Sequence, residues 1–240
     1  FSGYRAVQLR GVVSDLRAVC AHPGIDSGDS LDGNRIQLKH QDDLDEALGL
    51  SEKLECFDML LQAEKSVNRR VAVFAHSSTV LSLLSECMRV RFGEGTYRTI
   101  TSTTPSLDCR KAINSFNEDE SHVSFIVMHP IACGLGMSLE KLDTVIFFDS
   151  DWSVTSDITA LCRARKLGKA DSLRLYRLYC EDTIEERLIA LAEKTKGMEI
   201  ALRQSHGRAY SRGAKVLDEI LRAGVEQMFS EDAAGGKDPE

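Results

Sequence analysis

The sequence has no run of apolar residues long enough to span a bilayer, and no secretory signal peptide opens it. It has no Cys-x-x-Cys pair either, although it contains 7 cysteines. A structural zinc site needs clustered ligands, and a secreted disulfide framework is not expected in a chain of 240 residues with an odd cysteine count. We therefore predict no metal site, and we expect most cysteines to be small buried side chains in a reducing compartment.

Positive charge is in the minority, because 30 Lys and Arg stand against 37 Asp and Glu and leave a net charge of −7. This balance argues against indiscriminate wrapping by nucleic acid, so any contact with DNA must come from a local basic patch. A length of 240 residues fits one large domain, or one domain with appendages. The chain begins with Phe1 rather than Met, and we interpret it as a fragment of a longer protein.

The first part of the chain predicts helices around a loop. Apolar residues at helical spacing predict a helix over Ala6–Cys20, which His22-Pro23 ends. The Gly, Ser and Asp residues of Gly24–Glu46 predict a solvated loop, including the acidic stretch Gln41–Glu46. Ser51 then opens a helix with one apolar face, formed by Leu54, Phe57 and Leu61.

From Arg70 onward the pattern alternates between strands and helices. We expect strands at Val71–Phe74, Tyr97–Ile100, Val123–Met128, Thr144–Phe148 and Leu173–Tyr179, and helices at Val80–Met88 and Ser106–Phe116. Such alternation predicts an α/β fold, in which helices cover both faces of a parallel sheet. A further amphipathic helix is expected over Asp182–Arg203 and a last one over about 214–229. The expected division is N-terminal helices with an acidic loop at 1–69, the α/β lobe at 70–203, and a linker, C-terminal helix and acidic tail at 204–240.

Three short motifs follow one another in the second half. They are the glycine loop ACGLGMSL at Ala132–Leu139, the stretch DSDW at Asp149–Trp152 after the strand TVIFF, and RARKLGK at Arg163–Lys169. Taken separately, the first is only a turn with flexible glycines and the second only a strand end. Their order and spacing make the combination specific.

This combination resembles the C-terminal lobe of the Swi/Snf family of helicase-like chromatin-remodelling ATPases, which reads AGGLGINL, YDSDWNPQ and RAHRIGQ. Other stretches resemble the family in the same order, namely LRAVCAHP, SEKLECFDMLL, CRKAINSFN and RLYCEDTIEER. The resemblance covers about Val13 to Lys196, and it implies a RecA-like parallel sheet sandwiched by helices, with extra N- and C-terminal helices. The stretch that begins at Val216 is similar to the plant Pickle branch of chromodomain remodellers and to the Morpheus' molecule silencing branch.

The resemblance also implies how ATP chemistry is divided between two lobes. The first lobe of the family holds the phosphate-binding loop, and no GxxxxGK[ST] motif occurs here, so ATP and Mg²⁺ require a first lobe and this chain by itself holds no cofactor. The second lobe supplies two arginines three residues apart, and a glutamine. Here Arg163 fills the first arginine position, Lys166 the second, and Thr159 the glutamine position. A lysine keeps the charge but loses the planar fork of arginine.

Further positions carry over from the family to this sequence. They are the ATP-cleft residues Gly134, Gly136 and Asp149, and the nucleic-acid contacts Thr103, Thr104, Arg110, Arg165 and Lys169. Several of the family's polar positions differ here: the loop DGST is Thr101–Thr104, and the STR before the glycine loop is His129-Pro130-Ile131. Without the resemblance, Asp149 reads as a strand-end cap, His129 as a loop histidine, and Arg163–Lys169 as a solvated helix face.

Two functions stay open at this point. In the first, the motor is degenerate and the lobe is a scaffold in transcriptional gene silencing or chromatin organisation. In the second, it is the second motor lobe of an active remodeller that needs a first lobe. Both imply a nuclear protein, no membrane, and three kinds of partner: DNA or nucleosomes (weakly bound by this fragment), other chromatin or silencing proteins, and the first RecA-like lobe.

Overall fold

The computed structural model describes residues 2–25, 38–132, 138–150, 157, 173–190 and 192, and for 2–10 the backbone only. Within this part of the chain, the strands are β1 (Val71–Phe74), β2 (Tyr97–Ile100), β3 (Phe125–Met128), β4 (Thr144–Phe147) and β5 (Arg174–Arg177). They form one sheet of 5 strands in the order β2-β3-β1-β4-β5, and every neighbouring pair is parallel. The expected parallel α/β sheet is confirmed, and β1 lies at its centre.

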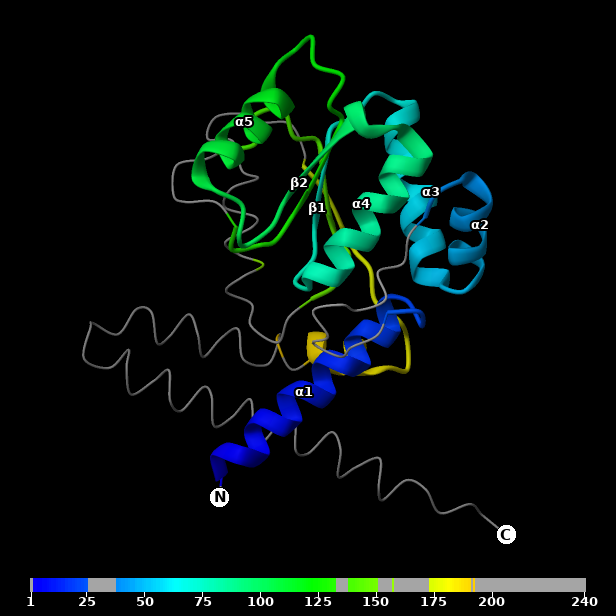
Figure 1. Cartoon of the computed structure of the whole chain (residues 1–240), viewed down its shortest axis with the longest axis vertical. Coiled ribbons are helices and arrows are strands. Elements are labelled where there is room, and N and C mark those ends of the chain that lie inside the picture. Colours follow the sequence, from blue (N-terminus) through cyan, green and yellow to red (C-terminus); the bar gives the residue numbers. More distant parts are fainter. Residues whose placement is uncertain are drawn as a thin grey trace, which may run out of the picture.

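The helices are α1 (Ser2–Ala21), α2 (Gln41–Gly49), α3 (Glu52–Ser66), α4 (Ser78–Phe92) and α5 (Ser106–Asn117), with a 3₁₀ turn at Glu94–Thr96 and a further helical stretch at 184–190. Figure 1 shows α5 on one side of the sheet and α3 and α4 on the other. None of the helices in the described ranges combines the length and the apolar character that crossing a bilayer requires.

The side chains of the strands divide between two buried clusters, as alternation along a strand requires. One face of the sheet packs against α2, α3 and α4 through Val71, Val73, Phe125, Val127 and Ile146. The other packs against α5 through Ala72, Phe74, Ile126, Val145 and Phe147. The central strands β1 and β3 are therefore apolar at every position, and β4 is apolar after its first residue, Thr144. Such strands are typical of a parallel sheet covered on both faces.

The acidic stretch Gln41–Glu46 was wrongly expected to be a loop, since it forms the first turns of α2. The carboxylate of Asp43 accepts the backbone N–H groups of Lys39 and His40 at 2.7 and 3.0 Å, which satisfies donors at the helix start. Leu44 and Ala47 are then buried against the rest of the domain. Three apolar residues in the otherwise polar 9-residue stretch of α2 were too weak a signal to predict this helix from the sequence.

The helix α3 begins as the sequence predicts. The hydroxyl of Ser51 accepts the N–H of Leu54 at 3.2 Å and donates to the carbonyl of Ala21 at 3.0 Å. One side chain thus caps α3 and ties it to the end of α1. The helix expected over Asp182–Arg203 is confirmed for 184–190, while its later part and the helix expected over about 214–229 lie outside the described residues. The expected domain boundaries stay predictions.

Candidate functional site at the carboxyl edge of the sheet

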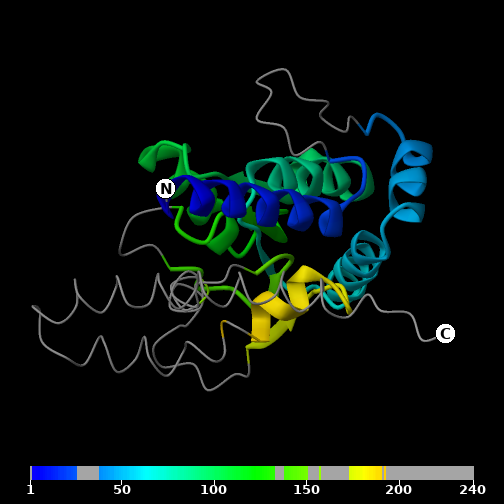
Figure 2. The same ribbon diagram turned by 90° about the horizontal axis from the view of Figure 1, so that it is seen from below.

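All five strands end at the same edge of the sheet, because they are parallel. In Figure 1 the helix α1 lies beneath this edge, and Figure 2 shows it lying across this end of the domain. The chain connections diverge between β1 and β4: β1 connects to β2 at one end of the sheet, and β4 connects to β5 at the other end. In open α/β sheets, ligands bind outside the carboxyl ends of the strands at such a switch point.

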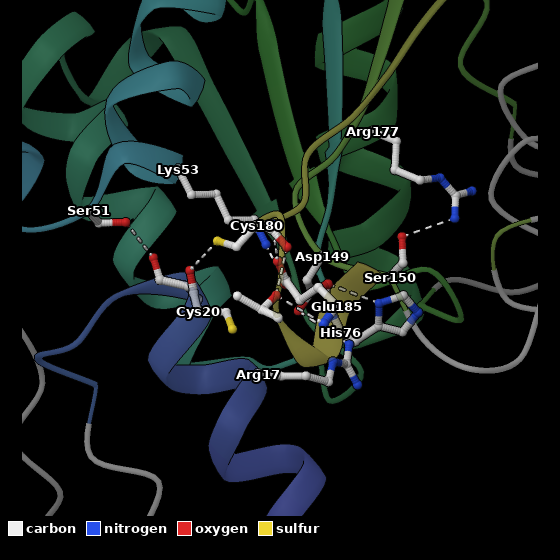
Figure 3. Close-up of polar contacts among 12 residues, drawn as sticks. Arg17, Cys20, Ser51, Lys53, His76, Asp149, Ser150, Arg177, Cys180 and Glu185 are labelled. Atoms are coloured by element: carbon white, nitrogen blue, oxygen red, sulfur yellow. Dashed lines mark hydrogen bonds and ion pairs between the residues drawn. The ribbon is translucent and has the colours of Figure 1, made fainter. Parts of the chain in front are cut away.

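Two residues meet at this switch point, His76 after β1 and Asp149 after β4 (Figure 3). The carboxylate oxygen Oδ1 of Asp149 accepts the backbone N–H of His76 at 2.8 Å and contacts its ring nitrogen Nδ1 at 3.0 Å. Because an ionised carboxylate only accepts, Nδ1 carries the proton in this contact. The other oxygen, Oδ2, lies 3.6 Å from Nη2 of Arg17 on α1.

The environment of Asp149 favours its ionised form even though the side chain is buried. Burial opposes ionisation, but the hydrogen bonds and charge of His76, together with the Arg17 guanidinium, outweigh it and lower the pKa from 3.8 to about 2. A carboxylate with these partners holds two loops and α1 together. This geometry matches that of an ion-paired strand-end cap, while the ATP-cleft role of Asp149 stays a prediction.

A second carboxylate, Asp157, continues the contacts across the edge. Its Oδ1 lies 3.9 Å from Nε2 of His76, and its Oδ2 lies 2.8 Å from Nη2 of Arg177 at the end of β5. The same guanidinium donates from Nη1 to the hydroxyl of Ser150 at 3.1 Å. The ring of His129, after β3, meets the His76 ring edge-on at 6.0 Å between centroids. We call Arg17, His76, Asp149, Ser150, Asp157 and Arg177 the edge network.

Among the described residues, the charged groups of the edge network pair with one another. Two carboxylates face two guanidiniums, and the imidazole of His76 lies between Asp149 and Asp157. A ring protonated on both nitrogens would therefore face one carboxylate from each side. Both carboxylates are almost fully buried, with 3% exposure for each residue, so breaking a contact would leave a buried charge.

The predicted nucleic-acid contacts Thr103 and Thr104 lie elsewhere on the same edge, in the loop between β2 and α5. The Thr104 hydroxyl accepts the N–H of Thr101 at 2.9 Å, and both Thr103 and Thr104 hydroxyls lie within 3.1 Å of the Thr101 hydroxyl. Arg110 is exposed on α5, which follows this loop. Since β2 and β4 are three strand spacings apart, the loop lies roughly 14 Å from Asp149.

The remaining predicted site residues, Gly134, Gly136, Arg163, Arg165, Lys166 and Lys169, lie outside the described residues. Their roles stay predictions. Asp157 is the described residue closest in sequence to Arg163, six positions before it. The edge network therefore holds the chain at Asp157, the described residue that precedes this stretch.

The sequence did not indicate His76, Asp157 or the contacts of Arg17 and Arg177. A signal existed for Arg17 and Arg177, since they lie in the stretches LRAVCAHP and RLYCEDTIEER that resemble the remodelling family. No signal existed for His76, because a single histidine after a strand is an ordinary loop residue.

Comparison with known proteins shows which families and chains this sequence resembles. The model of the helicase conserved C-terminal domain family matches residues 52–168. The chain is similar to two Arabidopsis thaliana proteins, Protein CHROMATIN REMODELING 4 (29% identity, 98% of this chain, 10% of that protein) and the CHD3-type chromatin-remodeling factor PICKLE (29%, 98% and 16%). It is also similar to the SWI/SNF-related matrix-associated actin-dependent regulator of chromatin subfamily A member 1 of Mus musculus, with 30% identity over 93% of this chain and 21% of that protein.

Among solved structures, the C-terminal part of the Fun30 ATPase domain shares the fold, with a TM-score of 0.55 and 24% identity over 61% of this chain and 46% of that chain. The curated relatives are much longer than this chain, which spans 10% to 21% of their length.

Proposed function

Because the chain contains a helicase conserved C-terminal domain and is related to the Swi/Snf-family chromatin-remodelling ATPases, we propose that it is a catalytically degenerate second lobe that serves as a scaffold. In this proposal it acts in the nucleus, in transcriptional gene silencing or chromatin organisation. Its partners are DNA or nucleosomes, other chromatin or silencing proteins, and a first RecA-like lobe.

The observation that carries the proposal is the residue pair at the arginine-finger positions, Arg163 and Lys166, with Thr159 in place of glutamine. An arginine finger contributes about 10³–10⁵ in rate to related phosphoryl transfers. A lysine supplies charge without the bidentate fork that spans two phosphate oxygens. The loss of this fork, together with the glutamine, is enough to silence turnover.

Contacts at the carboxyl edge support the same proposal. The Thr104 hydroxyl is bonded within its own loop, and Nδ1 of His129 accepts the N–H of Ile131 at 3.2 Å. Asp149 is bonded to His76 and paired with Arg17. Polar groups that could meet a nucleotide or a DNA phosphate instead satisfy one another. In this proposal, a lobe whose edge groups are bonded to one another offers a folded platform.

The second candidate function is the second motor lobe of an active remodeller. The glycines Gly134 and Gly136 and the first finger arginine Arg163 are retained, and one similar protein is itself described as the chromatin-remodeling ATPase INO80. In this case ATP and Mg²⁺ would be held chiefly by a first lobe, and Lys166 would be a tolerated substitute.

ATP hydrolysis in the whole protein separates the two functions. The assay measures turnover with and without DNA in the wild-type protein and in Arg163→Ala. The scaffold proposal expects no DNA-stimulated turnover in either protein, with nucleosome binding retained in both. DNA-stimulated turnover that Arg163→Ala abolishes would establish the motor instead.

A further inference from the structure

Two thiols and a carboxylate from distant parts of the chain meet beside the edge network. Cys20 lies near the end of α1, Cys180 follows β5, and Glu185 lies in the helical stretch 184–190. One donor atom from each, the two Sγ atoms and a carboxylate oxygen, lie within 4.8 Å of one another. Figure 3 shows the three side chains together with Lys53.

The carboxylate of Glu185 is held in place on both oxygens. Nζ of Lys53 donates to Oε1 at 2.5 Å, and the backbone N–H of Cys180 donates to Oε2 at 3.0 Å. The Lys53 and Glu185 side chains are only 3% and 4% exposed, whereas the two cysteines are half-buried and reachable from solvent. A carboxylate oxygen has a second lone pair, so Glu185 can keep these bonds and still coordinate.

We propose that Cys20, Cys180 and Glu185 form a binding site for a thiophilic divalent cation of the zinc type, with water as the fourth ligand. Thiolate and carboxylate donors suit Zn²⁺, whose bonds to sulfur and oxygen are about 2.3 and 2.0–2.2 Å long. Donors that already lie within 4.8 Å need inward movements of about 1 Å to reach tetrahedral distances.

The charge of the cluster agrees with a divalent ion. With both thiols protonated, the Lys53 ammonium and the Glu185 carboxylate cancel. Binding of one Zn²⁺ releases the two thiol protons to solvent, so the ion and two thiolates replace two neutral thiols and the net charge stays at zero. The Lys53 ammonium opposes the cation directly, but it also orients the carboxylate, as outer-shell partners of metal ligands do.

A bound ion would join α1 to the segment after β5, which are 160 positions apart at Cys20 and Cys180. At a free zinc concentration about 100-fold above Kd, one-site linkage raises the melting temperature of a domain of this size by roughly 5–10 °C. The site would then act as a clasp between the N-terminal helices and the end of the sheet.

The test is a titration of the reduced, chelator-treated 240-residue chain with Co²⁺ in a thiol-free reductant, followed by displacement with Zn²⁺. The proposal expects one equivalent of cobalt and a near-ultraviolet thiolate-to-cobalt absorption band. Cys20→Ser and Cys180→Ser should each weaken binding by more than about 10-fold. Cys56→Ser is the matched control, because Cys56 is also half-buried but lies on α3 outside the cluster, and it should leave binding unchanged.

A second measurement needs no variant, in case a serine variant fails to fold. Zn²⁺ should slow alkylation of Cys20 and Cys180 in the wild-type chain, as read by peptide mass spectrometry, and should leave the rate at Cys56 unchanged. Absence of the thiolate band, equal cobalt affinity in all variants, or unslowed alkylation would overturn the proposal. A Cys20–Cys180 disulfide that forms under mild oxidation in a chain that binds no metal would also overturn it.

Discussion

Replacement of Asp149 by asparagine tests the ion pairing of the edge network. The substitution keeps the size of the side chain and an oxygen that can accept the His76 N–H, but it removes the charge facing His76 and Arg17. The pKa of Asp149 falls from 3.8 to about 2 on folding, because contacts with His76 and Arg17 outweigh the effect of burial. At 1.36 kcal/mol per pKa unit, this difference corresponds to about 2 kcal/mol of stability at neutral pH.

The same difference in the pKa of Asp149 determines how its contribution to stability depends on pH. A carboxylate with a depressed pKa stabilises the folded state above its unfolded pKa, so the contribution is complete above about pH 5 and is lost as the pH falls through 4 towards 2. We therefore expect Asp149→Asn to lower the unfolding free energy by about 2 kcal/mol at pH 7, and the difference from wild type to shrink on acidification.

Urea unfolding followed by circular dichroism at several pH values measures this effect. Asp108→Asn is the matched control, because Asp108 is an exposed carboxylate on α5 whose pair with Lys111 is at the surface, and it should change stability by less than about 0.5 kcal/mol. A destabilisation of Asp149→Asn that is constant between pH 3 and pH 7, or none at all, would refute the ion-pair account.

Three further predictions concern the Lys53–Glu185 ion pair, the buried core and the contact with DNA. Lys53→Met should lower the unfolding free energy by roughly 3–5 kcal/mol, because it leaves the buried Glu185 carboxylate without its ion-pair partner. Adding Glu185→Gln should recover part of that loss. Strictly additive effects of the two substitutions in urea unfolding would contradict the pairing. Leu188→Asp should unfold or aggregate the domain, because the Leu188 side chain is buried with 1% exposure. The control Leu107→Asp, at a position that is 65% exposed, should melt like wild type. An unchanged melting curve for Leu188→Asp would show that this side chain is not packed. The chain by itself should bind DNA weakly. Arg110→Ala should reduce the slope of the logarithm of the DNA-binding constant against the logarithm of salt concentration by about 1, as measured by fluorescence anisotropy. An unchanged slope would exclude a phosphate contact at Arg110.

The fold could be predicted because its determinants are local. Each central strand is a short run of mostly apolar residues, such as Val71–Phe74, and amphipathic helices such as α4 lie between these runs. Alternation of the two patterns leaves a parallel sheet as the natural arrangement. The error at Gln41–Glu46 arose because α2 depends on a few buried side chains that only the tertiary structure identifies.

The site was less accessible to prediction because its contacts join distant positions. His76 reaches Asp149 across 73 positions, and Lys53 reaches Glu185 across 132. The expectation of no metal site followed from ligands that are scattered along the chain, yet the fold brings Cys20, Cys180 and Glu185 together. Spacing in the sequence is informative about a site only when its ligands share one element or one loop.

The measurement that tests the central claim most directly is DNA-stimulated ATP turnover in the whole protein, comparing wild type with Thr159→Gln/Lys166→Arg. If the lobe is degenerate at the finger positions, wild-type turnover stays at background and the double substitution raises it, towards the roughly 10³-fold lower limit of an arginine finger's contribution. Wild-type turnover that DNA already stimulates, and that the double substitution leaves unchanged, would contradict the account.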